Sequence, residues 1–225
     1  IATHGHEDHT GGLSFLLREL EFPIYGTALT LGLARNRIEE AGLLGRTEFI
    51  PIADGERRMI GPFDVEFIPV THSVPHGIAT AFHTPQGVIL HSGDFKLDLT
   101  PVDGRLTDLA RIGAIASTEG IRLLLSDSTN AEELGHAASE TSVGAVLYEL
   151  FHRYEGRRII TTCFASHIHR VQQIADAAIS FDRVIATMGM SMKKNVRMAR
   201  EMGLLNIPES RLMDIADVGD LPPEK

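Results

Sequence analysis

The sequence of 225 residues predicts an α/β protein made of two parts. Up to about residue 138, short strands follow one another through tight turns. Beyond it, strands alternate with helices through short links, which is typical of a doubly wound parallel sheet covered by helices. A hydrophobic content of 43% with 23% charged residues supports a buried core and excludes a disordered chain. We therefore expect one domain over 1–138 and a second over 139–225.

The first part combines helical and strand patterns. Leucines at positions 13, 16, 17 and 20 lie on one helical face, and Gly42 follows a second helical segment as a C-cap. A continuous apolar run at 123–125 predicts a strand buried on both faces. In chain order we expect a helix over 10–20, a strand at 24–25, a helix over 27–41, and strands over 49–52, 57–60, 65–70, 79–83, 88–91 and 123–125.

The second part follows a polar, turn-like stretch over 128–139. Its apolar periodicity switches regularly between strand and helix. We expect helices over 141–154, 167–179 and 192–202, and strands over 158–162 and 183–187.

Composition limits the classes of protein that fit. The net charge is −9, from 21 Lys and Arg against 30 Asp and Glu, which argues against general nucleic-acid affinity but not against a local basic groove. No apolar run reaches 18 residues, so no membrane span is expected. The single cysteine, Cys163, excludes an intrachain disulfide and favours a reducing compartment such as the cytoplasm.

Residues 3–9 read Thr-His-Gly-His-Glu-Asp-His and predict a metal site. On a helix, His4 and His6 would point about 200° apart. In a turn after a strand, with Gly5 freeing the backbone, both converge on one metal ion while Asp8 and His9 face a second. Imidazole and carboxylate together suit Zn²⁺ or a similar divalent ion.

Two later residues complete this predicted site. His72 and Asp94 each follow an expected strand, and side chains at neighbouring strand ends gather at one edge of a sheet. A carboxylate there can bridge two ions about 3.5–4 Å apart. Three further histidines of the first part lie outside this predicted set. His76 lines the site or is merely exposed, His83 is structural, and His91 either orients a ligand or has no such role.

Several separated motifs carry a family resemblance. The sequences His-Gly-His-Glu-Asp-His at 4–9, His-Ser-Gly-Asp-Phe-Lys at 91–96, Ser-Asp-Ser-Thr-Asn-Ala-Glu at 126–132, Phe-Ala-Ser-His-Ile-His-Arg at 164–170 and Gly-Met-Ser-Met at 189–192 resemble ribonuclease J. That family belongs to the β-CASP group of the metallo-β-lactamase superfamily. The resemblance implies a partial αββα sandwich followed by a partial β-CASP domain.

The resemblance also implies roles for individual residues. His4, His6 and His72 would hold one zinc ion, Asp8 and His9 the other, and Asp94 would bridge them. Asp127 would be the acidic residue of the first β-CASP motif, although from sequence alone a turn cap in Asp-Ser-Thr-Asn is an alternative.

Three features depart from the family. Its members have strands before the His-rich motif. They also return to the first domain after the β-CASP insert, which supplies a further ligand histidine and a catalytic histidine. We therefore expect these 225 residues to be a fragment that is inactive alone. The family commonly has Arg where Met190 stands.

A metal-dependent ribonuclease is the expected activity. A metal-bridging hydroxide would attack the phosphodiester and leave 5′-phosphate products, with Asp8 orienting it and accepting its proton. The resemblance implies single-stranded RNA as substrate, 5′–3′ exonuclease or endonuclease action in RNA processing and decay, and a homodimer or homotetramer. The alternatives are a hydrolase of this superfamily acting on small esters or thioesters, and a non-catalytic RNA-binding scaffold.

RNA contacts are expected in the second part. Ser166, His167 and Ser191 lie where helices are expected to begin, and helix N-termini favour phosphate. For both serines, ordinary N-capping is an equal alternative. The basic residues over 193–200 form either an RNA-facing stripe or a solvated helix face.

Overall fold

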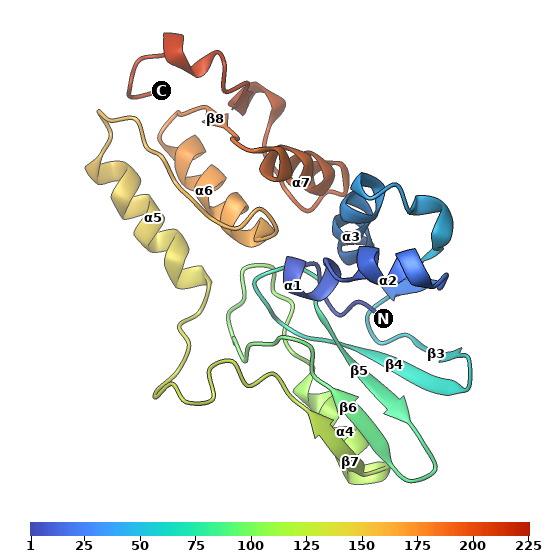
Figure 1. The fold of residues 1–225 in the computed structure, drawn as a ribbon. Coiled ribbons are helices and arrows are strands. Elements are labelled where there is room, and N and C mark those ends of the chain that lie inside the picture. The colour runs from blue at the N-terminus through green and yellow to red at the C-terminus, as the bar shows by residue number, and fades with distance from the viewer. The chain divides into compact units, whose positions relative to one another are not determined.

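The computed structural model describes all residues, 1–225, and divides the chain into two compact units, Ile1–Ala137 and Ala138–Lys225. Both units contain helices and strands, and the predicted mixed α/β class of the chain is confirmed (Figure 1).

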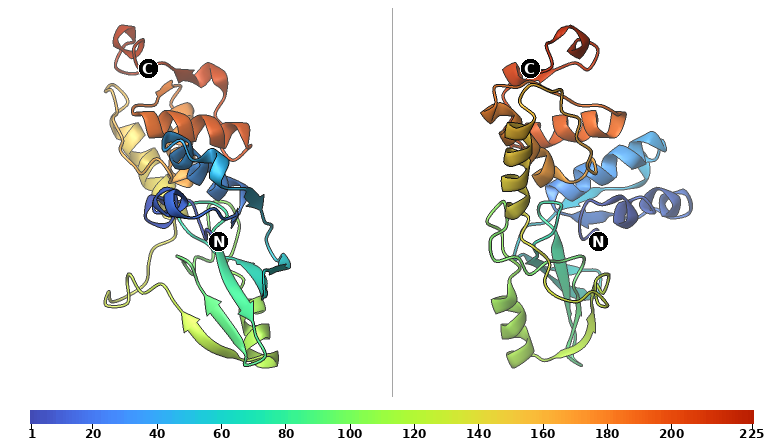
Figure 2. Two further views of the ribbon diagram at one scale, coloured as in Figure 1. Left: turned by 45° about the vertical axis from the view of Figure 1, so that its right-hand side comes forward. Right: turned by 90° about the vertical axis from the view of Figure 1, so that its left-hand side faces the viewer.

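The first unit is built on a five-stranded sheet in the order β3-β4-β5-β6-β7. Neighbouring strands are antiparallel except β6 and β7, which are parallel. Figures 1 and 2 show these strands as one twisted layer. The strands are β3 (Arg57–Ile60), β4 (Phe63–Pro69), β5 (Ile78–His83), β6 (Val88–His91) and β7 (Ile121–Leu125).

A second layer of short elements precedes this sheet along the chain. Strands β1 (Ile24–Gly26) and β2 (Phe49–Pro51) form a parallel pair. The N-terminal residues connect this pair to the large sheet, because Ala2 N–H donates to Tyr25 O at 2.8 Å and Ile78 N–H donates to Thr3 O at 2.9 Å. The helices of this layer are α1 (Glu7–Thr10), α2 (Leu13–Glu19), α3 (Ala28–Glu40) and the short 3₁₀ helix η1 (Leu44–Arg46).

The core of the first unit lies on both sides of the large sheet. On one side, Phe67 and Ile78 are fully buried with Ile52. On the other, helix α4 (Leu109–Thr118) packs Ile115 against Val88 and Leu90. The sheet is thereby fixed between two apolar layers, and the loops at its strand ends have a firm base.

Ion pairs join α4 to the sheet. Glu66 of β4 is buried, and its carboxylate accepts hydrogen bonds from Arg111 of α4 at 2.5 and 2.9 Å. The ring of His83 lies between Glu66 and Glu119, at 3.0 and 2.6 Å. These hydrogen bonds satisfy a carboxylate that would otherwise be costly to bury.

The second unit is mainly helical. Its short parallel pair consists of β8 (Ile185–Ala186) and β9 (Leu212–Met213). Phe151 and Ala178 are buried in its core with Ile174 beside them. The buried guanidinium of Arg183 donates to several backbone carbonyls. The helices are α5 (Thr141–Arg153), α6 (Ile168–Ser180), α7 (Met190–Glu201) and the 3₁₀ helices η2 (Glu209–Arg211) and η3 (Val218–Asp220).

Two sequence predictions about the elements are wrong, and one helix was not predicted. The helix expected over 10–20 is two helices, α1 and α2, because Gly11 and Gly12 separate them and glycine weakens a helix interior. The stretch over 158–162 forms no strand and is not part of a sheet. Helix α4 was not expected at all.

The expected burial of 123–125 is also wrong. Leu123, Leu124 and Leu125 are 47%, 56% and 46% exposed. The reason is that β7 is an edge strand, paired only with β6, so a run of leucines does not by itself place a strand between two layers. No helix of the structure has the length and apolar character that crossing a membrane requires.

Candidate metal centre

The first two histidines lie in the turn that leads into α1. His4 is 1% exposed, and His6 is the N-cap residue of α1, where its carbonyl accepts the hydroxyl of Thr10 at 2.9 Å. Gly5 matters here for a reason other than the expected one. A Cβ at Gly5 would lie 2.2 Å from Cδ1 of Leu33, so glycine allows the turn to pack closely against α3.

The other two residues come from loops at the ends of β4 and β6. His72 follows Thr71, which forms an isolated bridge with Lys96. Gly93 has φ +59°, a conformation that favours glycine, and a Cβ there would lie 2.7 Å from Ile78 O. This tight turn places Asp94 beside the histidines.

Four side chains converge as a possible ligand set: His4, His6, His72 and Asp94. Nδ1 of His6 lies 3.1 Å from Nε2 of His4 and 3.1 Å from Nε2 of His72. Oδ2 of Asp94 lies 3.7 and 3.8 Å from the same two Nε2 atoms. Ligands of a tetrahedral zinc ion are about 3.3 Å apart, given Zn–N bonds of about 2.0–2.1 Å. The donor types and the spacing therefore fit a divalent ion.

The second oxygen of Asp94 faces the remaining residues of the predicted site. Its Oδ1 lies 3.3 Å from Nε2 of His9, which in turn lies 3.6 Å from Oδ2 of Asp8. Both residues belong to α1 rather than to a loop, and the Asp8 side chain is 77% exposed. This geometry fits a carboxylate shared by two ions, and the roles of Asp8 and His9 as ligands stay predictions.

Burial favours the neutral form of His4, His6 and His72. Loss of solvation lowers the pKa of His4 to about 2 and that of His72 to about 4, with smaller effects of the neighbouring histidines in the same direction. The pKa of His6 is lowered as well, mainly by burial, although Asp8 and Asp94 oppose the shift. Neutral imidazoles keep the lone pair that a metal ion needs.

Asp127 lies in the loop after β7. Its backbone N–H donates to the hydroxyl of Ser92 at 2.9 Å, which ties the loops after β6 and β7 together. Partial burial acts to raise the pKa of Asp127, but hydrogen bonds from the backbone and hydroxyl of Thr129 and from the backbone of Phe95 outweigh it, so the pKa is lowered. A turn contact and a place near His72 are therefore both present, and the catalytic role stays a prediction.

The other histidines of the first unit have separate surroundings. His83 lies in the ion-pair network of Glu66. His91 accepts the backbone N–H of Gly93 at its Nδ1, at 3.0 Å, in the turn that carries Asp94. His76 has φ +62° and its carbonyl accepts the hydroxyl of Thr27 at 3.1 Å.

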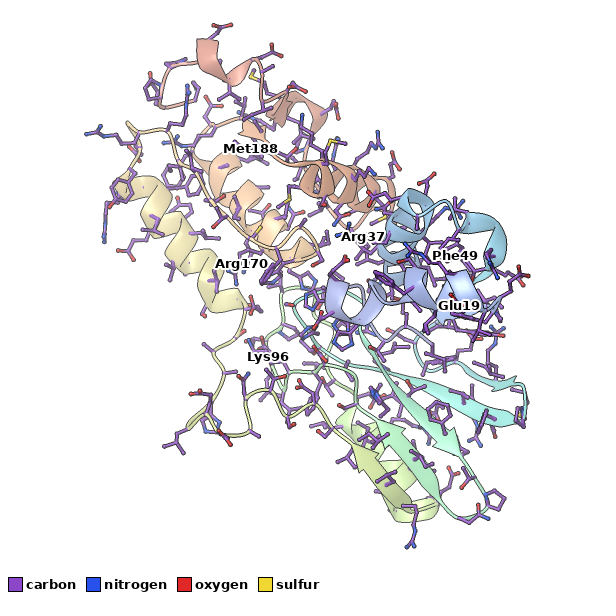
Figure 3. All side chains as sticks on the ribbon, viewed as in Figure 1. Glu19, Arg37, Phe49, Lys96, Arg170 and Met188 are labelled. Carbon is purple, nitrogen blue, oxygen red and sulfur yellow. The ribbon has the colours of Figure 1, made fainter.

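The predicted RNA contacts lie in the second unit. Ser166 precedes α6, and His167 is its N-cap residue. Ser191 lies inside the first turn of α7, whose N-cap is Gly189, so Ser191 is not an N-cap. Arg170 of α6, labelled in Figure 3, donates to Glu140 at 2.7 Å. The phosphate-binding role of these side chains stays a prediction.

Sequence reasoning missed two hydroxyls that touch the candidate ligands. Oγ1 of Thr3 lies 3.2 Å from Nδ1 of His4, and Oγ of Ser73 lies 3.1 Å from Nε2 of His6. The available signal was their position, because each is next in sequence to a predicted ligand.

Two family models match the chain, one in its first part and one in its last part. Residues 1–143 match the metallo-β-lactamase superfamily, and residues 156–225 match the β-CASP domain of ribonuclease J. The chain belongs to the metallo-β-lactamase superfamily. The fold of this superfamily implies binding of a divalent metal, in agreement with the donor set at the sheet edge.

Individual relatives confirm the resemblance to ribonuclease J. The chain is 41% identical over its whole length to ribonuclease J of Mycolicibacterium smegmatis, covering 40% of that protein, and 44% identical over 99% of its length to ribonuclease J of Thermus thermophilus, covering 39%. The chain thus spans about two fifths of these relatives.

Among solved structures, a protein of unknown function from Enterococcus faecalis V583 matches 99% of the chain and 56% of its own, with a TM-score of 0.65 and 15% identity. At that identity the match supports the fold alone.

Proposed function

We propose that this chain provides the metal-binding part of a metal-dependent ribonuclease that hydrolyses RNA phosphodiesters. The observation that carries the proposal is the convergence of His4, His6, His72 and Asp94 at one sheet edge, in a chain whose curated relatives are named ribonuclease J. Because the chain covers about two fifths of those relatives, the activity of the whole protein belongs to the proposal.

The donor set favours two zinc ions. His4, His6 and His72 with Oδ2 of Asp94 would hold one of them. Oδ1 of Asp94 with His9 and Asp8 would hold the other. Bound divalent ions lower the pKa of water and neutralise charge that builds on a phosphoryl group.

The chain's own acidic residues have distinct tasks in this proposal. Asp8 has an exposed carboxylate beside His9 and would orient an attacking water and take its proton. Asp127 is kept ionised by Thr129, at the loop that is tied to Ser92 next to the Asp94 turn. Asp127 would add a negative charge beside the metal centre and would hold the loop after β7 against the loop that carries Asp94.

The substrate would be single-stranded RNA, cut as a 5′–3′ exonuclease, as an endonuclease or as both, to leave 5′-phosphates. Ser166, His167 and Ser191 near the starts of α6 and α7 would contact phosphates. We further propose that the whole protein works in the cytoplasm as a homodimer or homotetramer.

The test measures bound metal and hydrolysis together, on the chain itself and on the longer protein if the gene encodes one. We expect the longer protein to bind about two divalent ions and to turn over 5′-monophosphorylated single-stranded RNA, and we expect no turnover by the chain alone. Bound metal with hydrolysis of small esters or thioesters but not of RNA would contradict the ribonuclease and favour another hydrolase. RNA binding without metal or turnover would favour a scaffold.

A further inference from the structure

Two hydroxyl groups lie just outside the candidate ligand set. Each contacts the ring nitrogen of a histidine that points away from the other ligands. We propose that Thr3 and Ser73 are positioning residues, each of which accepts a hydrogen bond from the ring nitrogen of a histidine that faces away from the metal centre. They would thereby fix which nitrogen His4 and His6 present to the ion. The inference rests on the proposed metal site and adds to it two residues that do not bind metal themselves.

The surroundings of His6 assign its two nitrogens. Nδ1 lies 3.1 Å from the Nε2 atoms of both His4 and His72, so it is the nitrogen at the centre of the ligand set. Nε2 lies on the far side, 3.1 Å from Oγ of Ser73. A neutral imidazole carries its proton on one nitrogen, and only the other can bind a metal. The Nε2–H of His6 therefore donates to Ser73, which leaves Nδ1 free for the ion.

His4 has the opposite arrangement. Its Nε2 faces Nδ1 of His6 at 3.1 Å and Oδ2 of Asp94 at 3.7 Å, so Nε2 is the inward nitrogen. Its Nδ1 lies 3.2 Å from the hydroxyl of Thr3. Since His4 is 1% exposed, bulk water has little access to replace that hydroxyl. The Nδ1–H of His4 therefore donates to Thr3, and Nε2 is free for the ion.

Both hydroxyls are held by backbone that the fold fixes. The carbonyl of Thr3 accepts the N–H of Ile78, the first residue of β5, at 2.9 Å. Ser73 directly follows His72 in sequence, so its bond to His6 joins two ligand-bearing segments across 67 residues of the chain. Partners of this kind set ring orientation and raise the basicity of the ligand, and their loss typically weakens metal binding about 10–100-fold.

Paired variants separate the hydroxyl from the packing of the side chain. Thr3→Val and Ser73→Ala remove the hydroxyl, whereas Thr3→Ser and Ser73→Thr keep it. Ser117→Ala, on the exposed surface of α4, is the matched control. Zinc affinity is measured by competition with a chelator. We expect about 10–100-fold weaker binding for the two variants without the hydroxyl, and affinity close to that of the unmodified chain for the other three.

A second readout observes the protons directly. In the zinc-loaded chain labelled with ¹⁵N-histidine, long-range ¹H–¹⁵N correlation should show metal at Nδ1 of His6 and Nε2 of His4, with protected protons on the opposite nitrogens. Ser73→Ala should expose the His6 proton to fast exchange, and Thr3→Val that of His4, with Ser73→Thr and Thr3→Ser restoring protection.

The outcomes distinguish this inference from the proposed function. Unchanged zinc affinity and unchanged imidazole protons in Thr3→Val and Ser73→Ala would overturn the positioning role while leaving the metal site intact. A loss of affinity in Ser73→Thr equal to that in Ser73→Ala would also overturn it, because packing rather than the hydroxyl would be responsible. If the unmodified chain bound no zinc, the metal site itself would fail and this inference with it.

Discussion

The two units of the chain use polar residues in different ways. In the first, a five-stranded ladder fixes the loops after β4 and β6, and four possible ligands come within 4.8 Å of one another. In the second, the strands are two residues long, and the marked side chains Ser166, His167 and Ser191 lie near the starts of two separate helices. The possible metal ligands therefore come together in the unit whose paired strands hold several loops close to one another.

We expect the largest effect on zinc affinity from a histidine variant in the first unit, compared with a histidine variant in the second. His6→Ala removes a ring nitrogen from the centre of the ligand set, so we expect zinc affinity to fall by at least about 100-fold, beyond what loss of an outer partner causes. His152→Ala, on the exposed surface of α5 where the ring pairs with Glu155, should bind zinc like the unmodified chain. Isothermal titration calorimetry measures both. Equal affinities in the two variants would mean that the histidine cluster does not bind the metal.

A glycine substitution tests whether the ligand-bearing turns are as tightly fixed as the contacts indicate. In Gly93→Ala, the new Cβ would lie 2.7 Å from Ile78 O at a φ of +59°, so we expect a loss of about 1–3 kcal/mol in the free energy of unfolding. Gly113→Ala in α4 meets no atom within 4 Å and should gain about 0.5–1 kcal/mol. Urea denaturation gives both values, and a neutral Gly93→Ala would contradict the tight turn.

The smallest effect concerns pH and the ion pairs on the α4 side of the sheet. Hydrogen bonds from Arg111 lower the pKa of Glu66, with a further contribution from His83. A lowered folded-state pKa stabilises the protein above about pH 4.5, the ordinary value, and this stability is lost as the pH falls through the folded-state pKa. Glu66→Gln should therefore be less stable than the unmodified chain near neutrality, with the difference shrinking in acid.

We expect the pH-dependent part of this difference to be about 1 kcal/mol or less, because Arg111 is 38% exposed and solvent screens the pair. Denaturation midpoints across the acid range measure it. Glu39→Gln, at an exposed position of α3, is the matched control. A difference between Glu66→Gln and the unmodified chain that does not change with pH would contradict the role of Glu66.

Much of the first unit was accessible from sequence because local signals and tertiary structure agree there. Strands β3 and β6 have the expected bounds, and the spacing of His4 and His6 required a turn rather than a helix, which the structure has. The structural role of Gly5 could not be predicted from the spacing of the histidines. The need for Gly5 comes from Leu33, a residue of α3 that only tertiary packing brings near.

The features that the sequence did not predict depend on tertiary contacts with residues far apart in the chain. Leucines at 123–125 follow the pattern of a buried strand, yet burial requires layers on both sides, and β7 is an edge strand. The β-branched stretch over 158–162 has strand propensity but no pairing strand. Thr3 and Ser73 are next in sequence to predicted ligands, but the sequence does not predict which ring nitrogen each hydroxyl contacts.

We infer that the loops after β4 and β6, together with the turn that leads into α1, hold two metal ions shared through Asp94. Anomalous X-ray scattering at the zinc edge from crystals of the zinc-loaded longer protein tests it most directly. The expected result is two peaks about 3.5–4 Å apart, one among His4, His6 and His72 and the other beside His9 and Asp8. No peak among those three histidines, or zinc bound only elsewhere on the protein, would contradict a metal centre at this position.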